Sequence, residues 1–344
     1  MFSSKIIGWY KENMRVLPWR KTRDPYRIWL SEIMLQQTRV EQGLPYYQKF
    51  IKHYPTVSQL ADASEEEVLK MWQGLGYYSR ARNLHATAKY VARDLNGKFP
   101  DTYKELRKLK GVGDYTASAI ASFCFDRPEP VVDGNVYRVL SRYFGVETPI
   151  NSTTGIKYFK SLAAELIDRS RPAEYNQGVM EFGALQCKPQ SPSCGDCPLN
   201  DGCVALEKDL ISSLPVKLKK TKVKDRFFNY LIFQSGGETL IQQRKGKGIW
   251  QNLYEFPLIE SDGELSIEEI ENHPLFKERL QGRDFELSLY NRETITHKLS
   301  HQHIYTKFWI VHLQSSIENG ISYHELEEYP MPVLIANFVK EYSF

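Results

Sequence analysis

The amino-acid sequence predicts two domains, an all-α domain followed by a smaller α+β domain. Its 344 residues are more than a single domain usually contains. Apolar residues recur at helical spacing up to about residue 210, and strand and turn patterns begin near residue 226. The segment between them, PVKLKKTKVKDR, has six basic residues and one acidic residue and starts at a proline. We therefore predict a helical domain over 1–210, a basic linker over 211–225 and an α+β domain over 226–344.

Helical patterns fill the first domain. Residues 1–16 read as an amphipathic helix rather than as a signal peptide. Ser64 is a predicted N-cap for the helical stretch 63–75, and residues 155–170 show apolar side chains at helical spacing.

The second domain combines strands with helices. Residues 226–234 and 239–245 flank the turn sequence SGGE, which predicts a β-hairpin. Residues 305–314 read as a further strand, and helices are expected at 266–276 and 332–344.

The expected compartment is the cytoplasm. No signal peptide opens the chain, and no run approaches the roughly 18 apolar residues of a membrane span. Thiols are kept reduced in the cytoplasm, so disulfides are not expected. The net charge of +3 is weak evidence for a nucleic-acid partner, and the basic linker serves either solubility or phosphate contact.

Four of the five cysteines lie within residues 187–203, as Cys187, Cys194, Cys197 and Cys203. Zinc usually takes two close pairs of cysteines, but only the central two are separated by two residues. Four thiolates in one loop can also hold a 4Fe–4S cluster. Spacing alone leaves zinc and iron–sulfur open. The fifth, Cys124, lies in an apolar helical stretch and is expected to be a small buried hydrophobe.

Three further motifs can carry chemistry. Gly111 and Gly113 in LKGVGDYT permit a tight turn with bare N–H groups at a helix start, which favours an anion, although an ordinary helix–helix turn has the same pattern. Glu32 stands among apolar residues in IWLSEIML, so it is either an edge residue of a core helix or a carboxyl whose pKa is raised by desolvation. Asp133 in PVVDGNVYRVL is first of all an N-cap candidate.

These motifs together resemble a known superfamily. The order WLSEIMLQQT, GLGYYSRARNLH, LKGVGDYTASAI, VVDGNVYRVL and the cysteine loop is similar to that of the helix–hairpin–helix DNA glycosylases with a 4Fe–4S cluster. Within it, the two-domain chain most resembles the MutY family of adenine DNA glycosylases. The resemblance implies a hydrolase of N-glycosyl bonds that flips adenine out of the duplex in base excision repair. It also implies a 4Fe–4S cluster held by Cys187, Cys194, Cys197 and Cys203.

The resemblance assigns roles to residues of the first domain. Glu32 is implied as the general acid that protonates N7 of adenine, and Asp133 as the carboxylate that stabilises the oxocarbenium-like sugar or bonds to it. The partial positive charge at the start of a helix is expected to keep Asp133 ionised. Other implied residues orient these groups (Tyr115, Asn135), line the adenine pocket (Arg20, Gln177), contact the lesion strand (Gln37, Thr38), enter the base stack (Tyr77) or bind phosphate (Gly111, Gly113).

Tyr115 also indicates that the enzyme is monofunctional. Related enzymes that cut the strand have a lysine in this slot, and its amine attacks the sugar. The alternative is a bifunctional pyrimidine-lesion glycosylase and lyase of the endonuclease III type. A third possibility, a non-catalytic DNA-binding protein, is disfavoured because two carboxylates near phosphates would repel them.

The second domain resembles a Nudix domain without its hydrolytic motif. The sequence GIWQNLYEFPLIESDGELSIEEIE lacks the glutamate-rich helix that would hold magnesium, so we expect a reader of 8-oxoguanine. Leu299, Ser300 and His301 align with the family's Phe-Ser-His, with leucine in place of phenylalanine. His297, His301 and His303 would share one face of a strand, which raises a minor zinc alternative. The implied partner is double-stranded DNA with A·8-oxoguanine or A·G mispairs. We expect a monomer, with no membrane contact and nucleoid-associated if bacterial.

Overall fold

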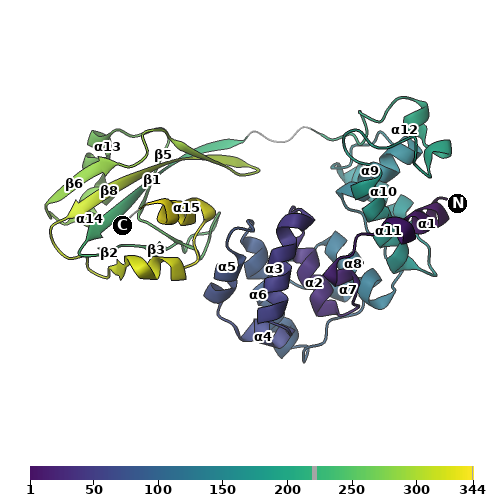
Figure 1. The fold of residues 1–344 in the computed structure, drawn as a ribbon, viewed down its shortest axis with the longest axis horizontal. Helices are drawn as coiled ribbons and strands as arrows, with labels where there is room; N and C mark the ends of the chain where they lie inside the picture. The colour runs from purple at the N-terminus through teal and green to yellow at the C-terminus, as the bar shows by residue number, and fades with distance from the viewer. Residues whose placement is uncertain (219–222, 343) are drawn as a thin grey trace. The chain divides into compact units, whose positions relative to one another are not determined.

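The computed structural model describes residues 1–218, 223–342 and 344, and these form two compact units (Figure 1). The first comprises Met1–Asp62 and Asn83–Lys219, and the second comprises Ala63–Arg82 and Lys220–Phe344. The centre of the predicted linker, 219–222, lies outside the described residues.

The first unit is helical, as predicted. Figure 1 shows two groups of helices, with α2–α4 and α6–α8 in one and α1 and α9–α12 in the other. The first group consists of α2 (Pro25–Met34), α3 (Val40–His53), α4 (Val57–Asp62), α6 (Ser79–Arg93), α7 (Tyr103–Leu106) and α8 (Asp114–Phe125). The second consists of α1 (Phe2–Asn13), α9 (Gly134–Phe144), α10 (Thr153–Leu166), α11 (Pro172–Leu185) and α12 (Val204–Glu207). Short 3₁₀ turns occupy Pro18–Arg20 and Asn200–Gly202.

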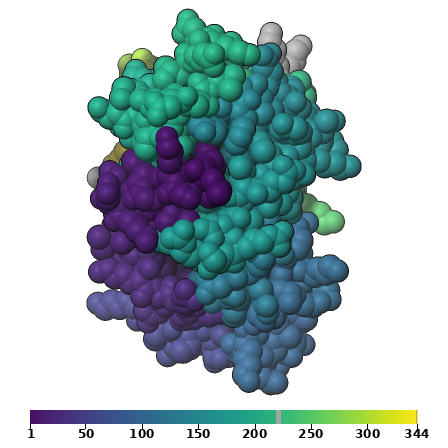
Figure 2. Space-filling view, turned by 90° about the vertical axis from the view of Figure 1, so that its right-hand side faces the viewer, coloured from purple at the N-terminus to yellow at the C-terminus, as the bar shows by residue number. Residues whose placement is uncertain are grey.

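Helix α11 lies at the centre of the second group. It packs against α1, α8 and α9, and its buried Val179 and Phe182 join Ile6 and Leu140 in one apolar core. In Figure 2 the purple N-terminal helix lies directly against teal segments from later in the chain, as its packing on α11 requires. Gly183 brings α9 close, because a Cβ at this position would lie 2.6 Å from the Cβ of Asn135.

Two predicted helix starts are confirmed. Ser64 caps α5 (Glu65–Trp72) in a capping box with Glu67. Asp133 caps α9 by accepting hydrogen bonds from the N–H groups of Asn135 and Val136.

The second unit is built on a mixed sheet with the strand order β6-β8-β1-β2-β9. The long strands β1 (Lys224–Ser235) and β8 (Gln302–Leu313) pair in parallel from Lys224↔Gln302 to Gln234↔His312. Strand β5 pairs with β1 and β7 with β8, and β3 pairs with β4 in a separate ribbon. The remaining strands are β2 (Glu238–Thr239), β3 (Gln242–Gln243), β4 (Tyr254–Glu255), β5 (Leu258–Ser261), β6 (Phe285–Leu289), β7 (Ile295–Lys298) and β9 (Ile321–Ser322).

Helices complete the apolar core on the sheet. Side chains alternate between the two faces of a strand, and Leu231 and Trp309 join a cluster that includes Ile270 and Phe276 from α13 (Ile267–Asn272) and α14 (Pro274–Leu280). Phe308 stacks at 4.1 Å on Phe338 of α15 (Val333–Glu341). A 3₁₀ turn spans Tyr323–Glu328.

Three details differ from the sequence prediction. The predicted helix 266–276 is two helices, because Pro274 has no N–H and disfavours a helical residue before it; His273 caps the second helix instead. The predicted strand 239–245 leaves the sheet after Thr239 and pairs elsewhere as β3. The three histidines do not share one strand, since His297 lies on β7, His303 on β8 and His301 in the turn between them.

Gly183→Ala should lower the free energy of unfolding by about 1–3 kcal/mol, because the added methyl group overpacks the contact with Asn135. The matched control is Gly8→Ala on α1, where a Cβ meets nothing within 4 Å and should be neutral or stabilising. Urea unfolding of both variants measures the difference. Equal stability of the two variants would mean that α9 and α11 can separate without cost.

Candidate active site

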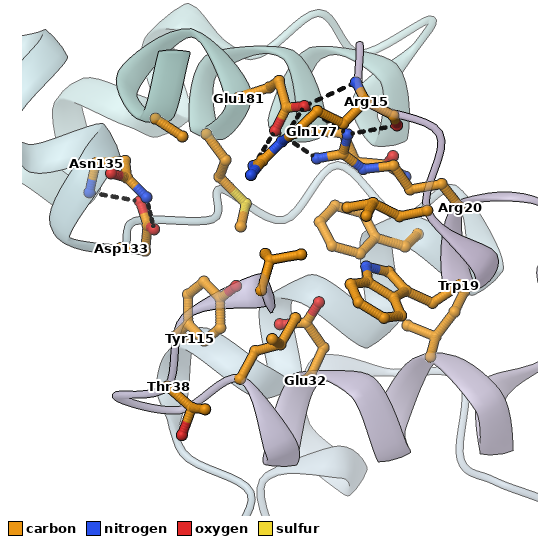
Figure 3. A pocket seen from close by; sticks show the side chains of 17 residues that line it. Arg15, Trp19, Arg20, Glu32, Thr38, Tyr115, Asp133, Asn135, Gln177 and Glu181 are labelled. Carbon is orange, nitrogen blue, oxygen red and sulfur yellow. Dashed lines mark hydrogen bonds and ion pairs between the residues drawn. The ribbon is translucent and has the colours of Figure 1, made fainter. Parts of the chain in front are cut away.

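A cavity of about 180 Å³ opens between the two helix groups of the first unit. Figure 3 shows the 17 side chains around it. They come from α2, α3, α8, α9 and α11, from the turn Pro18–Arg20 and from the loops beside these elements. Carboxylates face the cavity from three sides, which are those of Glu32, Asp133 and Glu181.

Glu32 lies in α2 and is only 6% exposed. Its helix buries seven neighbouring residues from Tyr26 to Met34, so the carboxyl group sits in an apolar wall. Burial raises the pKa of Glu32 to about 7, a hydrogen bond with Tyr115 opposes this rise, and the negative charge of Asp133 adds to it. The predicted desolvation of Glu32 is therefore present, and the group can be protonated near neutral pH.

Tyr115 stands in the first turn of α8 and shares a hydrogen bond with Glu32. Burial, followed by the charge of Glu32, raises the pKa of the Tyr115 hydroxyl well above its ordinary value. The hydroxyl group therefore stays protonated and can donate a hydrogen bond to a carboxyl oxygen of Glu32.

Asp133 is fixed by three donors at the start of α9. Its carboxylate accepts from the backbone N–H of Asn135 at 2.9 Å, from the N–H of Val136 at 2.8 Å and from Nδ2 of Asn135 at 2.7 Å. Burial raises the pKa of Asp133 even so, because desolvation outweighs these donors. Burial and the three donors therefore act on its charge in opposite directions, while the donors fix the orientation of the carboxylate.

Glu181 was not predicted from the sequence. It is 1% exposed, and its oxygens accept hydrogen bonds from Arg15 at 2.9 and 2.7 Å and from Arg20 at 2.8 Å (Figure 3). Burial would raise the pKa of Glu181, but these arginines together lower it to about 2. The signal in the sequence was its position four residues after Gln177, which places both on one face of α11.

The structure gathers most of the predicted catalytic set into this cavity. Gln177 lines it and accepts a hydrogen bond from Tyr10 Oη at 2.8 Å. Gln37 does not line the cavity and has a left-handed backbone with φ 55°. The predicted residues that line it are Arg20, Glu32, Thr38, Tyr115, Asp133, Asn135 and Gln177, and the apolar wall includes Trp19 and Met180, which the sequence did not single out.

Gly111 and Gly113 form the turn before α8. Gly111 has φ 79°, and a Cβ there would lie 2.8 Å from the Cβ of Asn83. Gly113 is the N-cap residue of α8 and provides no side-chain cap. The start of α8 therefore has free space for an external hydrogen-bond acceptor.

The predicted lesion-reading residues line a different cavity, of about 520 Å³, in the second unit. Tyr77, Leu299, Ser300 and His301 all contribute to its lining. The turn between β7 and β8 is closed by the N–H of Leu299, which donates to the carbonyl of Gln302 at 2.8 Å. Tyr77 is 44% exposed and has φ 48°, so its ring projects from a left-handed position.

The four cysteines of the loop 187–203 lie within electrostatic reach of one another, since Cys197 senses the charges of the other three thiols. Burial raises the pKa of Cys197 to about 11, and a backbone N–H at Leu199 opposes this rise. Arg142 donates to Cys187 Sγ at 3.5 Å and to the carbonyl of Lys188 at 2.7 Å. N–H donors reach the sulfur atoms of Cys187 and Cys197, which suits thiolate ligands of an iron–sulfur cluster. The described residues do not themselves bring three or more metal-ligating side chains together around one point.

One side chain joins this loop to the cavity. Arg138 donates to the carbonyl of Cys187 at 2.7 Å and to Oδ1 of Asn135 at 2.9 Å. It also donates to the carbonyl of Gly183 at 2.6 Å. The position of Asn135, and through it that of Asp133, therefore depends on the fold of the cysteine loop.

Three protein families match the chain. Residues 30–169 match the HhH-GPD superfamily base excision DNA repair protein, residues 187–203 the iron-sulfur binding domain of endonuclease III, and residues 229–341 the NUDIX domain. An adenine DNA glycosylase of Buchnera aphidicola (strain Bp) is 36% identical over 90% of this chain and 86% of its own length. The human adenine DNA glycosylase is 43% identical over 60% of this chain and 40% of its own length.

The chain belongs to the adenine DNA glycosylase family. It is a base excision repair glycosidase whose substrate is DNA, and it carries the 4Fe–4S cluster of this family rather than zinc. Among solved structures, a thermostable thymine-DNA glycosylase aligns with a TM-score of 0.56 and 33% identity over 60% of this chain and 95% of that chain. An endonuclease III–DNA complex shares the fold, with a TM-score of 0.53, 23% identity and coverage of 60% and 94%. Within the described part of the chain, no helix combines the length and apolar character that a membrane crossing needs.

If Glu32 is the general acid, the single-turnover rate of adenine release should fall as the pH rises through about 7, because the acid must be protonated to act. Well above that pH, each further unit removes about nine-tenths of the protonated form. On the acidic side, the rate should fall at a pH above the ordinary range of aspartate, since the pKa of Asp133 is raised. Duplex affinity measured over the same pH range is the control. A rate that is flat from about pH 6 to about pH 9 would contradict this role of Glu32.

Proposed function

We propose that this glycosylase removes adenine from mispairs with 8-oxoguanine or guanine by hydrolysing the N-glycosidic bond. The observation that carries the proposal is a buried, protonatable Glu32 in the same small cavity as the oriented carboxylate of Asp133. Two carboxyl groups with separated tasks are the usual equipment for cleaving a glycosidic bond. The cavity is sized for one base, so the adenine must leave the stack to reach it.

Glu32 is the general acid. It gives its proton to N7 of adenine, which lets the C1′–N9 bond break with its electron pair on the departing base. Tyr115 donates to Glu32 and holds the carboxyl group in place, and its raised pKa keeps it a donor throughout. The apolar setting keeps the proton on Glu32 until the base arrives.

Asp133 stabilises the sugar. As the bond breaks, C1′ becomes oxocarbenium-like, and the Asp133 carboxylate either faces this positive charge or bonds to C1′. Water then adds its oxygen to C1′, any bond to Asp133 breaks with its electron pair on the carboxylate, and the proton that water loses returns to Glu32. Asn135 fixes its orientation. A cationic sugar favours the ionised carboxylate, which offsets the effect of burial on its pKa.

Glu181 and Gln177 recognise the flipped base. Glu181 is an anion with acceptor oxygens only, and it faces the cavity beside Arg20. The exocyclic amino group of adenine can take an acceptor position on Glu181 by displacing one of the arginine donors, which the O6 acceptor of guanine cannot do. The cavity would therefore select adenine by polarity as well as by size.

The enzyme is proposed to be monofunctional. Among the described residues that line the cavity there is no lysine, and Tyr115 occupies the position next to the hairpin where an amine would attack the sugar. Without an amine no Schiff base forms, and the product is an abasic site. The endonuclease III-type alternative therefore lacks its nucleophile.

The second unit is proposed to read the opposite base. Tyr77 projects into the cavity that Leu299, Ser300 and His301 also line, so one aromatic ring and two hydrogen-bonding side chains can meet the lesion there. 8-Oxoguanine differs from guanine by an oxygen at C8 and a hydrogen on N7. Leu299 supplies apolar bulk without ring stacking.

The remaining assignments concern binding. Cys187, Cys194, Cys197 and Cys203 are the proposed cluster ligands, whose chemistry when bound is that of an iron–sulfur centre. Gly111 and Gly113 offer N–H groups to a phosphate at the start of α8, and Gln37 and Thr38 face the lesion strand. The partner is double-stranded DNA, and we propose that the enzyme binds it as a monomer.

Ser300→Ala combined with His301→Ala should reduce the preference for 8-oxoguanine over guanine, since each lost contact removes about 1–3 kcal/mol of discrimination. The measurement is the ratio of single-turnover rates on the two duplexes at one salt concentration. Adenine release from A·G is the control and should change much less. His312→Ala, on the strand β8 that follows the turn of Ser300 and His301 but outside the cavity, is the matched variant and should leave the ratio unchanged. An unchanged ratio in the double variant would assign lesion reading elsewhere.

A further inference from the structure

An acidic residue stands directly after the proposed phosphate-binding turn. Asp114 follows Gly113 directly and is the first residue of α8, and its side chain is 52% exposed. The N–H groups at this helix start favour an anion from outside. A fixed carboxylate at the same place opposes a phosphate, because like charges repel.

Two side chains from distant segments hold this carboxylate. Lys160 of α10 forms an ion pair with Asp114 Oδ1, and the hydroxyl group of Tyr103, the first residue of α7, donates to the same oxygen. Lys160 Nζ also donates to Tyr103 Oη at 3.2 Å and lies 4.5 Å from the centroid of its ring. Three helices therefore meet at one carboxylate oxygen.

The pKa values of Asp114 and Lys160 show that the two side chains stabilise each other's charge. Burial raises the pKa of Asp114, but the hydrogen bonds from Lys160 and Tyr103 together reverse this and lower it. Burial likewise lowers the pKa of Lys160, and its bonds to Asp114 and Tyr103 raise it. Both groups are therefore charged at neutral pH, and their charges cancel where the helix begins.

The other acidic residue of this segment is also neutralised by a lysine. Glu105 of α7 pairs with Lys108 at 2.7 Å. The segment 103–114 then presents the charges of Lys104, Arg107 and Lys110 beside the turn. Arg107 also donates to the carbonyl of Val112 at 3.3 Å, inside the turn itself.

We propose that Lys160 is a positioning residue for DNA binding, which turns the Asp114 side chain away from the phosphate site and neutralises it. This inference rests on the proposed role of the Gly111–Gly113 turn as a phosphate contact. Tyr103 fixes the other side of the carboxylate, so α7, α8 and α10 hold the turn as one unit. Tyr115 is the next residue on α8, so the same cluster sets the entry of this helix into the catalytic cavity.

The test compares four proteins: the wild type, Lys160→Met, Asp114→Asn and the double variant. Each is titrated with a duplex in which a 2′-fluorinated adenosine, which resists cleavage, faces guanine, at several sodium chloride concentrations. Lys160→Met leaves the Asp114 charge uncompensated and should weaken binding about tenfold at low salt, with the difference shrinking as salt rises. Asp114→Asn should bind as tightly as the wild type or more tightly. The double variant should return to within about twofold of the wild type, because the repelling charge is gone.

Two controls separate charge from structure. Lys11→Met removes the same charge from an ion pair with Glu174 elsewhere in this unit, at 3.6 Å, and should change affinity less than about twofold. Lys160→Arg should keep wild-type affinity. The single-turnover rate on cleavable duplex at saturating enzyme should change far less than affinity in Lys160→Met.

Restored binding in the double variant supports the inference. Unchanged binding by Lys160→Met, or a double variant as weak as or weaker than Lys160→Met, overturns it and leaves the proposed excision chemistry intact. A wild-type protein that bound the duplex with no dependence on salt would contradict the proposed phosphate contact at Gly111 and Gly113. The role of Lys160, which rests on that contact, would then be contradicted as well.

Discussion

The active site depends on one constraint, which is that a carboxyl group must be held out of water in the middle of a helix. Burial moves the pKa of Glu32 from 4.5 to about 7. At about 1.4 kcal/mol per unit, its ionised form is destabilised by roughly 3 kcal/mol relative to an exposed glutamate. The buried apolar residues of α2 pack against α8, and this packing offsets the cost. The result is an acid that still holds its proton at the pH where ordinary glutamates have lost theirs.

The same cavity keeps a second carboxylate fully ionised by different means. Glu181 is as buried as Glu32, yet its pKa is about 2 because two guanidinium groups donate to it. In the proposed mechanism, this separation of pKa values lets Glu32 deliver a proton at a pH where Glu181 stays ionised. Asp133 combines both influences, with donors that orient it and burial that raises its pKa. The environment, rather than the residue type, therefore divides the work.

The sequence predicted features that depend on neighbours in the chain. The caps at Ser64 and Asp133 and the β-hairpin at Gly236 follow from local rules and are present. The break at Pro274 was readable from the same rules, since proline disfavours a helix before it. The residues grouped around Glu32 were predicted from the order of the motifs, which resembles that of a known family. The residue pattern alone left Glu32 as an edge residue of a core helix and Asp133 as an N-cap. Glu181 was missed, because its spacing from Gln177 was the one local signal and its partner Arg15 lies 166 residues away, so that only the packing of α11 brings the two together.

The protonation state of Glu32 tests this account most directly. Infrared difference spectra between the wild type and Glu32→Gln isolate the C=O stretch of one protonated carboxyl group, and a titration from about pH 5 to about pH 9 follows its loss. This band should be present at mildly acidic pH and disappear with a midpoint near the pKa of about 7. A Glu32 that is already ionised at about pH 5 would contradict it, because the cavity would then contain no acid able to protonate the departing base.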